Sequence, residues 1–115
     1  MFLSYLRYLL KRKNEYHIHS PFVYKLYTEV IRGDHPEALK ELGIDKTETL
    51  AEGAFPQKDE SVMYVMNDIH KNKQKEAFWN TICGQPDVTL TIDLYDKGLA
   101  FYREGMEKQN FILRR

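Results

Sequence analysis

An acid and a histidine stand two residues apart, directly after a short apolar run. The run covers residues 62–66, and Asp68 and His70 follow it. A continuous apolar run of this length is typical of a strand covered on both faces. Open α/β sheets place their ligand crevice outside the carboxyl ends of the strands, where such a pair can hold a metal or move a proton. Asp68 and His70 are therefore the candidate catalytic residues. The simpler interpretation, which the residue types favour, is a helix cap and an exposed loop.

The other histidines and the single cysteine form no recognisable metal site. His17 and His19 do not share a helix face, and His35 adds no ligand at a known spacing. Cys83 is alone, which excludes an internal disulfide and a four-cysteine zinc site and fits a reducing cytoplasm. We expect no metal, no disulfide partner and a cytoplasmic location. Cys83, beside Trp79 on a helix face, is interpreted as a small buried apolar residue.

The charge is balanced over the whole chain but not along it. The 115 residues hold 17 basic and 17 acidic side chains. Residues 1–32 carry six basic and two acidic groups, residues 33–60 three and eight, and residues 61–115 eight and seven. No overall field attracts nucleic acid, and the lysines at 71, 73 and 75 are interpreted as a solvated helix face. We therefore expect no nucleic-acid partner.

The chain divides into three segments that we expect to form one domain. Residues 1–33 predict two helices: a basic amphipathic one over 1–14, and one that starts at Ser20-Pro21 and ends at Gly33. The first could lie on a membrane surface, but packing on its own domain is the commoner arrangement. Residues 34–60 are an acidic connector, interpreted as one short helix followed by a loop.

Residues 61–115 predict an α/β unit. A strand at 62–66 leads to a helix over 72–83, then to a strand at 88–94 and a hairpin partner at 99–102; residues 111–113 could add a last strand. A strand-helix-strand unit makes the first two strands parallel. The doubly apolar 99–102 strand belongs inside the sheet and the alternating 88–94 strand at an edge. The predicted spatial order is 62–66, 99–102, 88–94.

Two segments resemble one bacterial group of class I S-adenosylmethionine-dependent methyltransferases. The stretch YHIHSPFVY at 16–24 is similar to the helical lead-in of that group, and residues 62–115, with NDIH, TLTIDL and FILR, are similar to its C-terminal third. The predicted strand order is also that of the far end of its sheet. The resemblance implies a truncated Rossmann-like methyltransferase sheet, strand-helix-strand plus an antiparallel hairpin strand, with N-terminal helices. It also places Asp68 and His70 at a functional position of the family, although Asn67 stands where the family usually has another acid.

The part of the family that binds the cofactor has no counterpart in this sequence. Its first strand ends in a glycine-rich turn, and its second in an acid that holds the ribose. All six glycines here stand apart, at 33, 43, 53, 84, 98 and 105, so there is no Gly-x-Gly. The chain looks like the two ends of a methyltransferase joined across an internal deletion. We therefore expect a non-catalytic, methyltransferase-like protein with no cofactor of its own.

The deletion also removes a neighbouring strand. This leaves the edge of the 62–66 strand exposed, and we expect it to form a homodimer there or to be covered by the N-terminal helices. The alternative function is a methyltransferase whose S-adenosylmethionine site is completed by another chain or by a missing segment.

Overall fold

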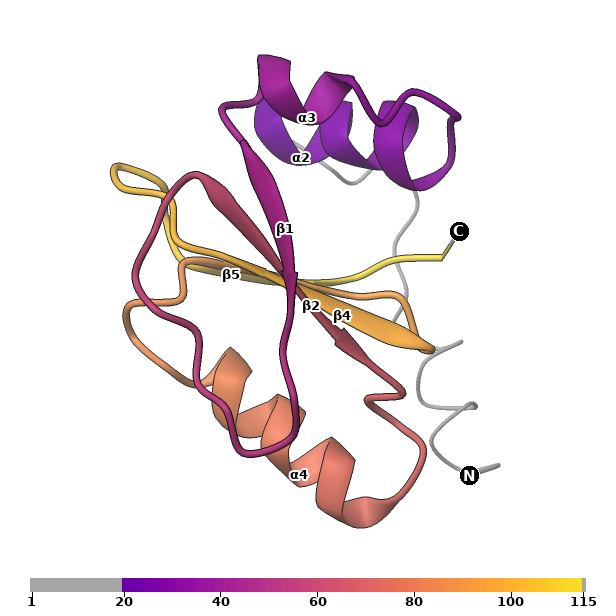
Figure 1. Ribbon diagram of the computed structural model, residues 1–115, viewed down its shortest axis with the longest axis vertical. Coiled ribbons are helices and arrows are strands. Elements are labelled where there is room, and N and C mark those ends of the chain that lie inside the picture. Colours follow the sequence, from indigo (N-terminus) through magenta and orange to yellow (C-terminus); the bar gives the residue numbers. More distant parts are fainter. Residues whose placement is uncertain (1–19, 115) are drawn as a thin grey trace.

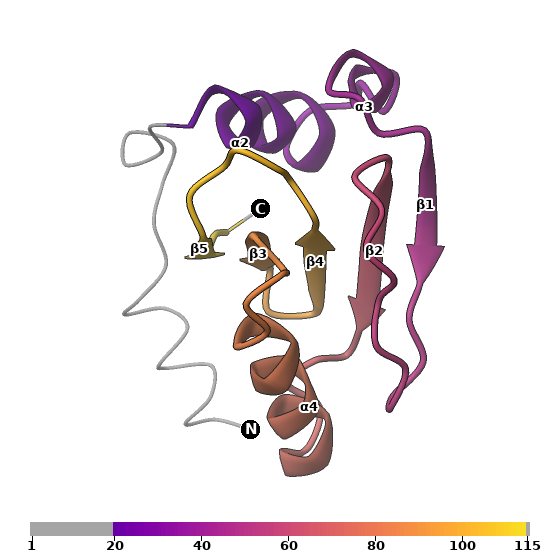
Figure 2. The ribbon, with the colours of Figure 1, turned by 90° about the vertical axis from the view of Figure 1, so that its left-hand side faces the viewer.

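A five-stranded mixed sheet organises residues 20–114, the part of the chain that the computed structural model describes (Figure 1). The strands are β1 (Lys46–Thr49), β2 (Val62–Asn67), β3 (Leu90–Asp93), β4 (Lys97–Phe101) and β5 (Gln109–Ile112), in the spatial order β1-β2-β4-β3-β5. β4 runs antiparallel to both β2 and β3, while β1 is parallel to β2 and β5 to β3. Figure 2 shows the five strands from β5 to β1. The predicted order of the three central strands is confirmed.

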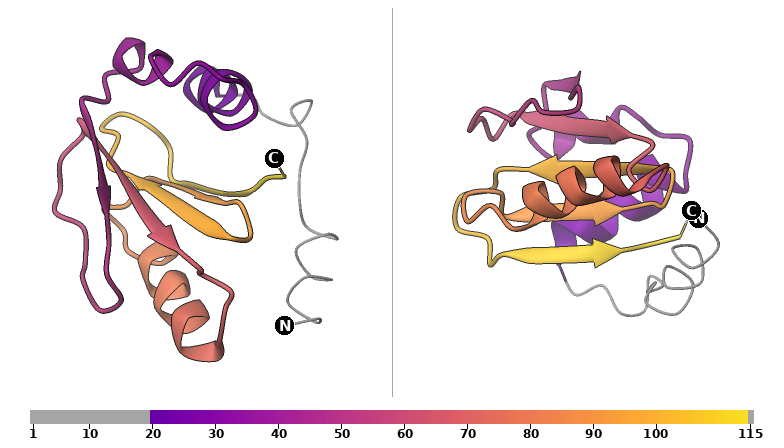
Figure 3. Two further views of the ribbon diagram at one scale, coloured as in Figure 1. Left: turned by 45° about the vertical axis from the view of Figure 1, so that its right-hand side comes forward. Right: turned by 90° about the horizontal axis from the view of Figure 1, so that it is seen from below.

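Helices lie on both sides of this sheet (Figures 1 and 3). On one side are α2 (Pro21–Lys25), the π-helix η2 (Leu26–Ile31) that continues it, and α3 (Ala38–Glu41); on the other is α4 (Lys73–Cys83). The predicted helix start is confirmed, since the Ser20 hydroxyl accepts the Val23 amide at 3.3 Å and Pro21 follows. The expected 1–14 helix lies outside the described residues. No helix within 20–114 is long and apolar enough to cross a membrane.

The alternation of side chains along the strands gives each face its own core. Leu99 and Phe101 of β4 pack with Leu26 and Tyr27 on the η2 side. Ala100 and Tyr102 pack with Trp79 on the α4 side. The sheet is therefore buried on both faces at its centre, which is why β2 and β4 consist of almost continuous apolar runs.

The connector contains a strand that the sequence analysis did not predict. Its short helix is present as α3, but β1 follows it and pairs with β2 in register from Lys46 opposite Val62 to Thr49 opposite Val65. The expectation of an exposed edge on the 62–66 strand is therefore wrong. All four residues of β1 are exposed, so the segment carries no apolar period that would mark it as a strand.

The 88–94 strand is not at an edge, because β5 covers its outer side. The expectation of a half-exposed strand fails because its polar side chains find partners inside the fold. The Thr91 hydroxyl donates to Asn110 Oδ1 at 2.5 Å, and Asp93, 6% exposed, bonds to His70. The suggested last strand near 111–113 is confirmed as β5.

Candidate functional site

His70 lies in the loop between β2 and α4, and both nitrogens of its ring are bonded. Nε2 lies 2.7 Å from Asp93 Oδ2, at the end of β3, and Nδ1 lies 2.6 Å from Glu76 Oε2, in the first turn of α4. The side chains of His70 and Asp93 are 14% and 9% exposed. We call these three residues the His70 clamp. It ties together a loop, a helix and a strand that are separate in the sequence.

The hairpin between β3 and β4 completes the surroundings of the ring. Tyr95 stacks on His70 with ring centroids 5.3 Å apart, and its φ of 72° places it in the left-handed region. Its amide donates to Asp93 Oδ1 at 2.8 Å, so the same carboxylate holds both the hairpin and the histidine. This hydrogen bond stabilises Tyr95 in a backbone conformation that few residues other than glycine adopt.

Asp68 is not brought to His70. It is exposed, with a φ of 58°, and its amide donates to Asp96 O at 2.7 Å. Nor does it cap α4, because Asn72 takes that place and accepts the Lys75 amide at 2.8 Å. The predicted pair therefore does not act as one unit. The expectations of Asp68 as helix cap and of His70 as an exposed loop residue are both wrong.

The two carboxylates favour the charged form of the imidazole. Burial, the largest single influence, lowers the pKa of His70, but the hydrogen bonds and charges of Asp93 and Glu76 together outweigh it, and the pKa lies above 6.5. A histidine whose pKa is raised on folding stabilises the fold fully below its unfolded pKa, near 6.5. That contribution is lost as the pH rises through the higher folded pKa.

This geometry suits a structural imidazolium better than a general base. A base needs a free ring nitrogen that a substrate proton can reach, and both nitrogens of His70 already face carboxylates. The two acids bind opposite nitrogens of the ring. Within residues 20–114 no group of three His, Cys, Asp or Glu side chains is placed to hold a metal ion.

Cys83 and His35 lie away from the clamp's ring contacts. Cys83 is partly buried, and burial raises the pKa of its thiol, so it stays protonated at neutral pH. His35 is exposed, and its ring Nδ1 lies 3.1 Å from Oε1 of the neighbouring Glu37. His17 and His19 lie outside the described residues.

Sequence analysis missed Asp93 and Glu76. In the sequence Asp93 is one polar position of an alternating strand, and no pattern singles out Glu76. One signal was available: β2 and β3 point the same way, so the residues that follow each of them meet at one edge of the sheet. That rule brings His70 and Asp93 together. The rule does not predict the contact between Glu76 and His70, because that contact depends on how α4 packs.

Comparison of the chain with family models, with curated proteins and with solved structures gives no match in any of the three. The resemblance to methyltransferases therefore rests on the sequence segments that carry it.

Proposed function

We propose that this chain is a non-catalytic, methyltransferase-like protein with a truncated Rossmann-like sheet, acting in the cytoplasm through self-association or partner binding. The observation that carries the non-catalytic part is the His70 clamp. The one histidine at the family's functional position has both ring nitrogens held by carboxylates. The absence of a Gly-x-Gly from the sequence supports the same proposal.

The outer edge of β1 is the surface that best fits self-association. Lys46 and Leu50 donate their amides toward β2, so the alternation along the strand turns the amides of Thr47 and Thr49 outward. An open strand edge of this kind is a template for pairing with another chain. The homodimer is therefore proposed at β1, in place of the covered edge of β2.

The charges of β1 select one way of pairing. An antiparallel, two-fold pair centred on Thr47 sets Lys46 of one copy opposite Glu48 of the other, on both sides of the axis. Thr47 then exchanges hydrogen bonds with the partner's Thr47, which its outward amide allows. A parallel pairing in register would set like charges opposite one another.

We expect light scattering to give the mass of a dimer for the wild type and of a monomer for Thr47→Pro. Proline removes the outward amide of Thr47, which the pairing with β2 does not use, so the fold is retained. Thr47→Val keeps that amide and the branched shape, and should remain dimeric.

A charge reversal tests the pairing itself. Glu48→Lys should weaken the dimer, and the double variant Lys46→Glu/Glu48→Lys should restore it. A monomeric wild type at every concentration contradicts self-association at β1. A dimer that Thr47→Pro leaves unchanged shows that the interface lies elsewhere.

The second candidate is a methyltransferase whose S-adenosylmethionine site is completed by another chain or by a segment missing from this sequence. The family resemblance of Asp68 and His70 is what favours it. The two proposals differ in one property, since only the second requires the associated chain to bind the cofactor.

A further inference from the structure

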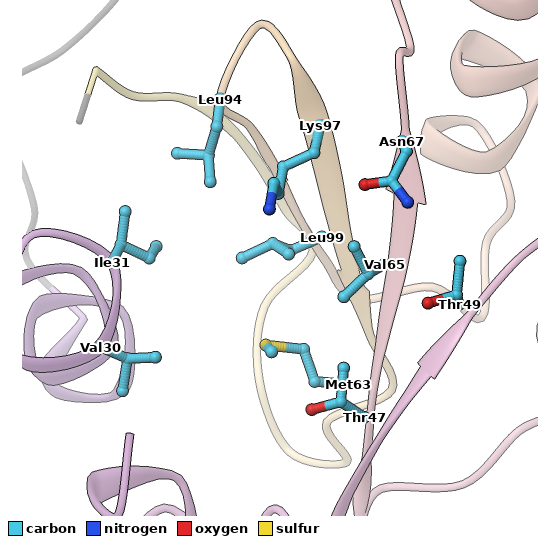
Figure 4. A pocket seen from close by; sticks show the side chains of 10 residues that line it. All are labelled: Val30, Ile31, Thr47, Thr49, Met63, Val65, Asn67, Leu94, Lys97 and Leu99. Atoms are coloured by element: carbon cyan, nitrogen blue, oxygen red, sulfur yellow. The ribbon is translucent and has the colours of Figure 1, made fainter. Parts of the chain in front are cut away.

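A cavity of about 560 Å³ lies between η2 and the exposed end of the sheet (Figure 4). This volume is in the range of pockets that enclose small molecules. Its walls come from η2, β1, β2, β4 and the turn before β4. The cavity is on the face of the sheet opposite α4, so its walls share no residue with the His70 clamp.

The lining separates into an apolar part and a polar part. Val30 and Ile31 of η2 face Met63, Val65 and Leu99 of the sheet across the cavity (Figure 4). The polar groups stand along the strands at its margin.

Asn67 and Lys97 form one end of the cavity, directly opposite each other where β2 ends and β4 begins. The hydroxyls of Thr47 and Thr49 lie along its β1 side. A ligand that fits this lining has a polar head and an apolar tail.

The charge of the cavity lining determines which charge the polar head of the ligand carries. Of the lining residues that the structure describes, Lys97 is the one charged side chain and none is acidic. Among the described residues, its ammonium forms no ion pair within 4.0 Å, whereas Lys25 and Lys46 each have a glutamate. Lys97 is a half-buried residue, and an ammonium without a counter-ion favours an anionic ligand. The Asn67 amide can add a second hydrogen-bond donor to that ligand.

We propose that this cavity binds a single-chain aliphatic carboxylate. The carboxylate lies between Lys97 and Asn67, and the chain extends over Met63 and Val65 toward η2. This proposal does not rest on the proposed self-association, which uses the backbone edge of β1. The two sites share Thr47 and Thr49, whose side chains line the cavity, but the charged end of the cavity at Lys97 lies outside that edge.

Calorimetric titration with sodium decanoate tests the site. We expect saturable binding, weakened about tenfold or more in Lys97→Gln, which loses the charge-assisted bond. Lys71→Gln, which removes an exposed lysine of the loop before α4, should bind as the wild type does. Decan-1-ol, which has no charge, should bind equally to the wild type and to Lys97→Gln.

Chain length tests the apolar part. Each methylene removed between decanoate and hexanoate should weaken binding about fourfold while it remains in contact with the walls. Methyl resonances of Met63 and Val65 should shift on saturation, and circular dichroism should show an unchanged fold. No saturable binding up to the solubility limit, or equal affinity of wild type and Lys97→Gln for decanoate, would overturn the proposal.

Discussion

Replacing Asp93 with alanine is expected to lower the free energy of unfolding by about 3 kcal/mol, because it leaves a largely buried imidazolium without one of its two carboxylates. The same change removes the acceptor of the Tyr95 amide, so the hairpin between β3 and β4 loosens as well. Urea unfolding near pH 6 measures the loss. Glu37→Ala is the matched control: it removes the carboxylate from the exposed His35, and no measurable change is expected.

The effect should depend on pH with a defined sign. The pKa of His70 is raised on folding, so the clamp contributes fully below about 6.5 and less as the pH passes the folded pKa. The difference in stability between wild type and Asp93→Ala should therefore shrink from pH 6 toward alkaline pH. Nuclear magnetic resonance titration of the ring should give a pKa above 6.5. A difference that stays constant with pH contradicts a charged clamp.

Gly98→Ala is expected to lower the free energy of unfolding by about 2 kcal/mol. Trp79 of α4 lies directly on Gly98 of β4, and a Cβ there would be 2.4 Å from the six-membered ring of the indole. Trp79 is 3% exposed and packed in the core, so it cannot move aside freely. Thermal and urea unfolding of the purified variant measure the loss.

Two further variants locate the cause in that contact. Gly84→Ala adds the same methyl group after α4, where the nearest atom would be 3.5 Å away and φ is −85°, so no loss is expected. In a Trp79→Phe background the shorter ring should reduce the cost of Gly98→Ala. An equal cost in both backgrounds would show that Trp79 is not the obstacle.

Gly98 also shows what the sequence could and could not predict. The apolar runs and the alternation predicted that β2, β3 and β4 exist and in which order they lie, because these strands carry the buried side chains that make such patterns. They did not predict that β3 is internal, because its polar side chains find partners inside the fold. Nothing in the pattern indicated that a glycine inside β4 makes room for an indole. The close approach between α4 and β4 depends on how the two elements pack together. The sequence of neither element alone predicts it.

β1 and the His70 clamp were missed for different reasons. Each residue of Lys46–Thr49 is exposed, so the strand exists through its backbone bonds to β2 and leaves no hydrophobic signal. In the clamp, Glu76, Asp93 and His70 are polar residues that look solvated in the sequence. Asp93 is buried and His70 and Glu76 are partly buried, which their mutual contacts allow, and those contacts appear only in three dimensions.

Calorimetric titration of S-adenosylmethionine into the purified chain is the most direct test of the proposed function. The titration should be made with the associated wild type and with Thr47→Pro, since a site completed by association would bind only in the first. A non-catalytic, methyltransferase-like protein predicts no saturable heat with either. Micromolar binding to either one would contradict this account and favour a methyltransferase.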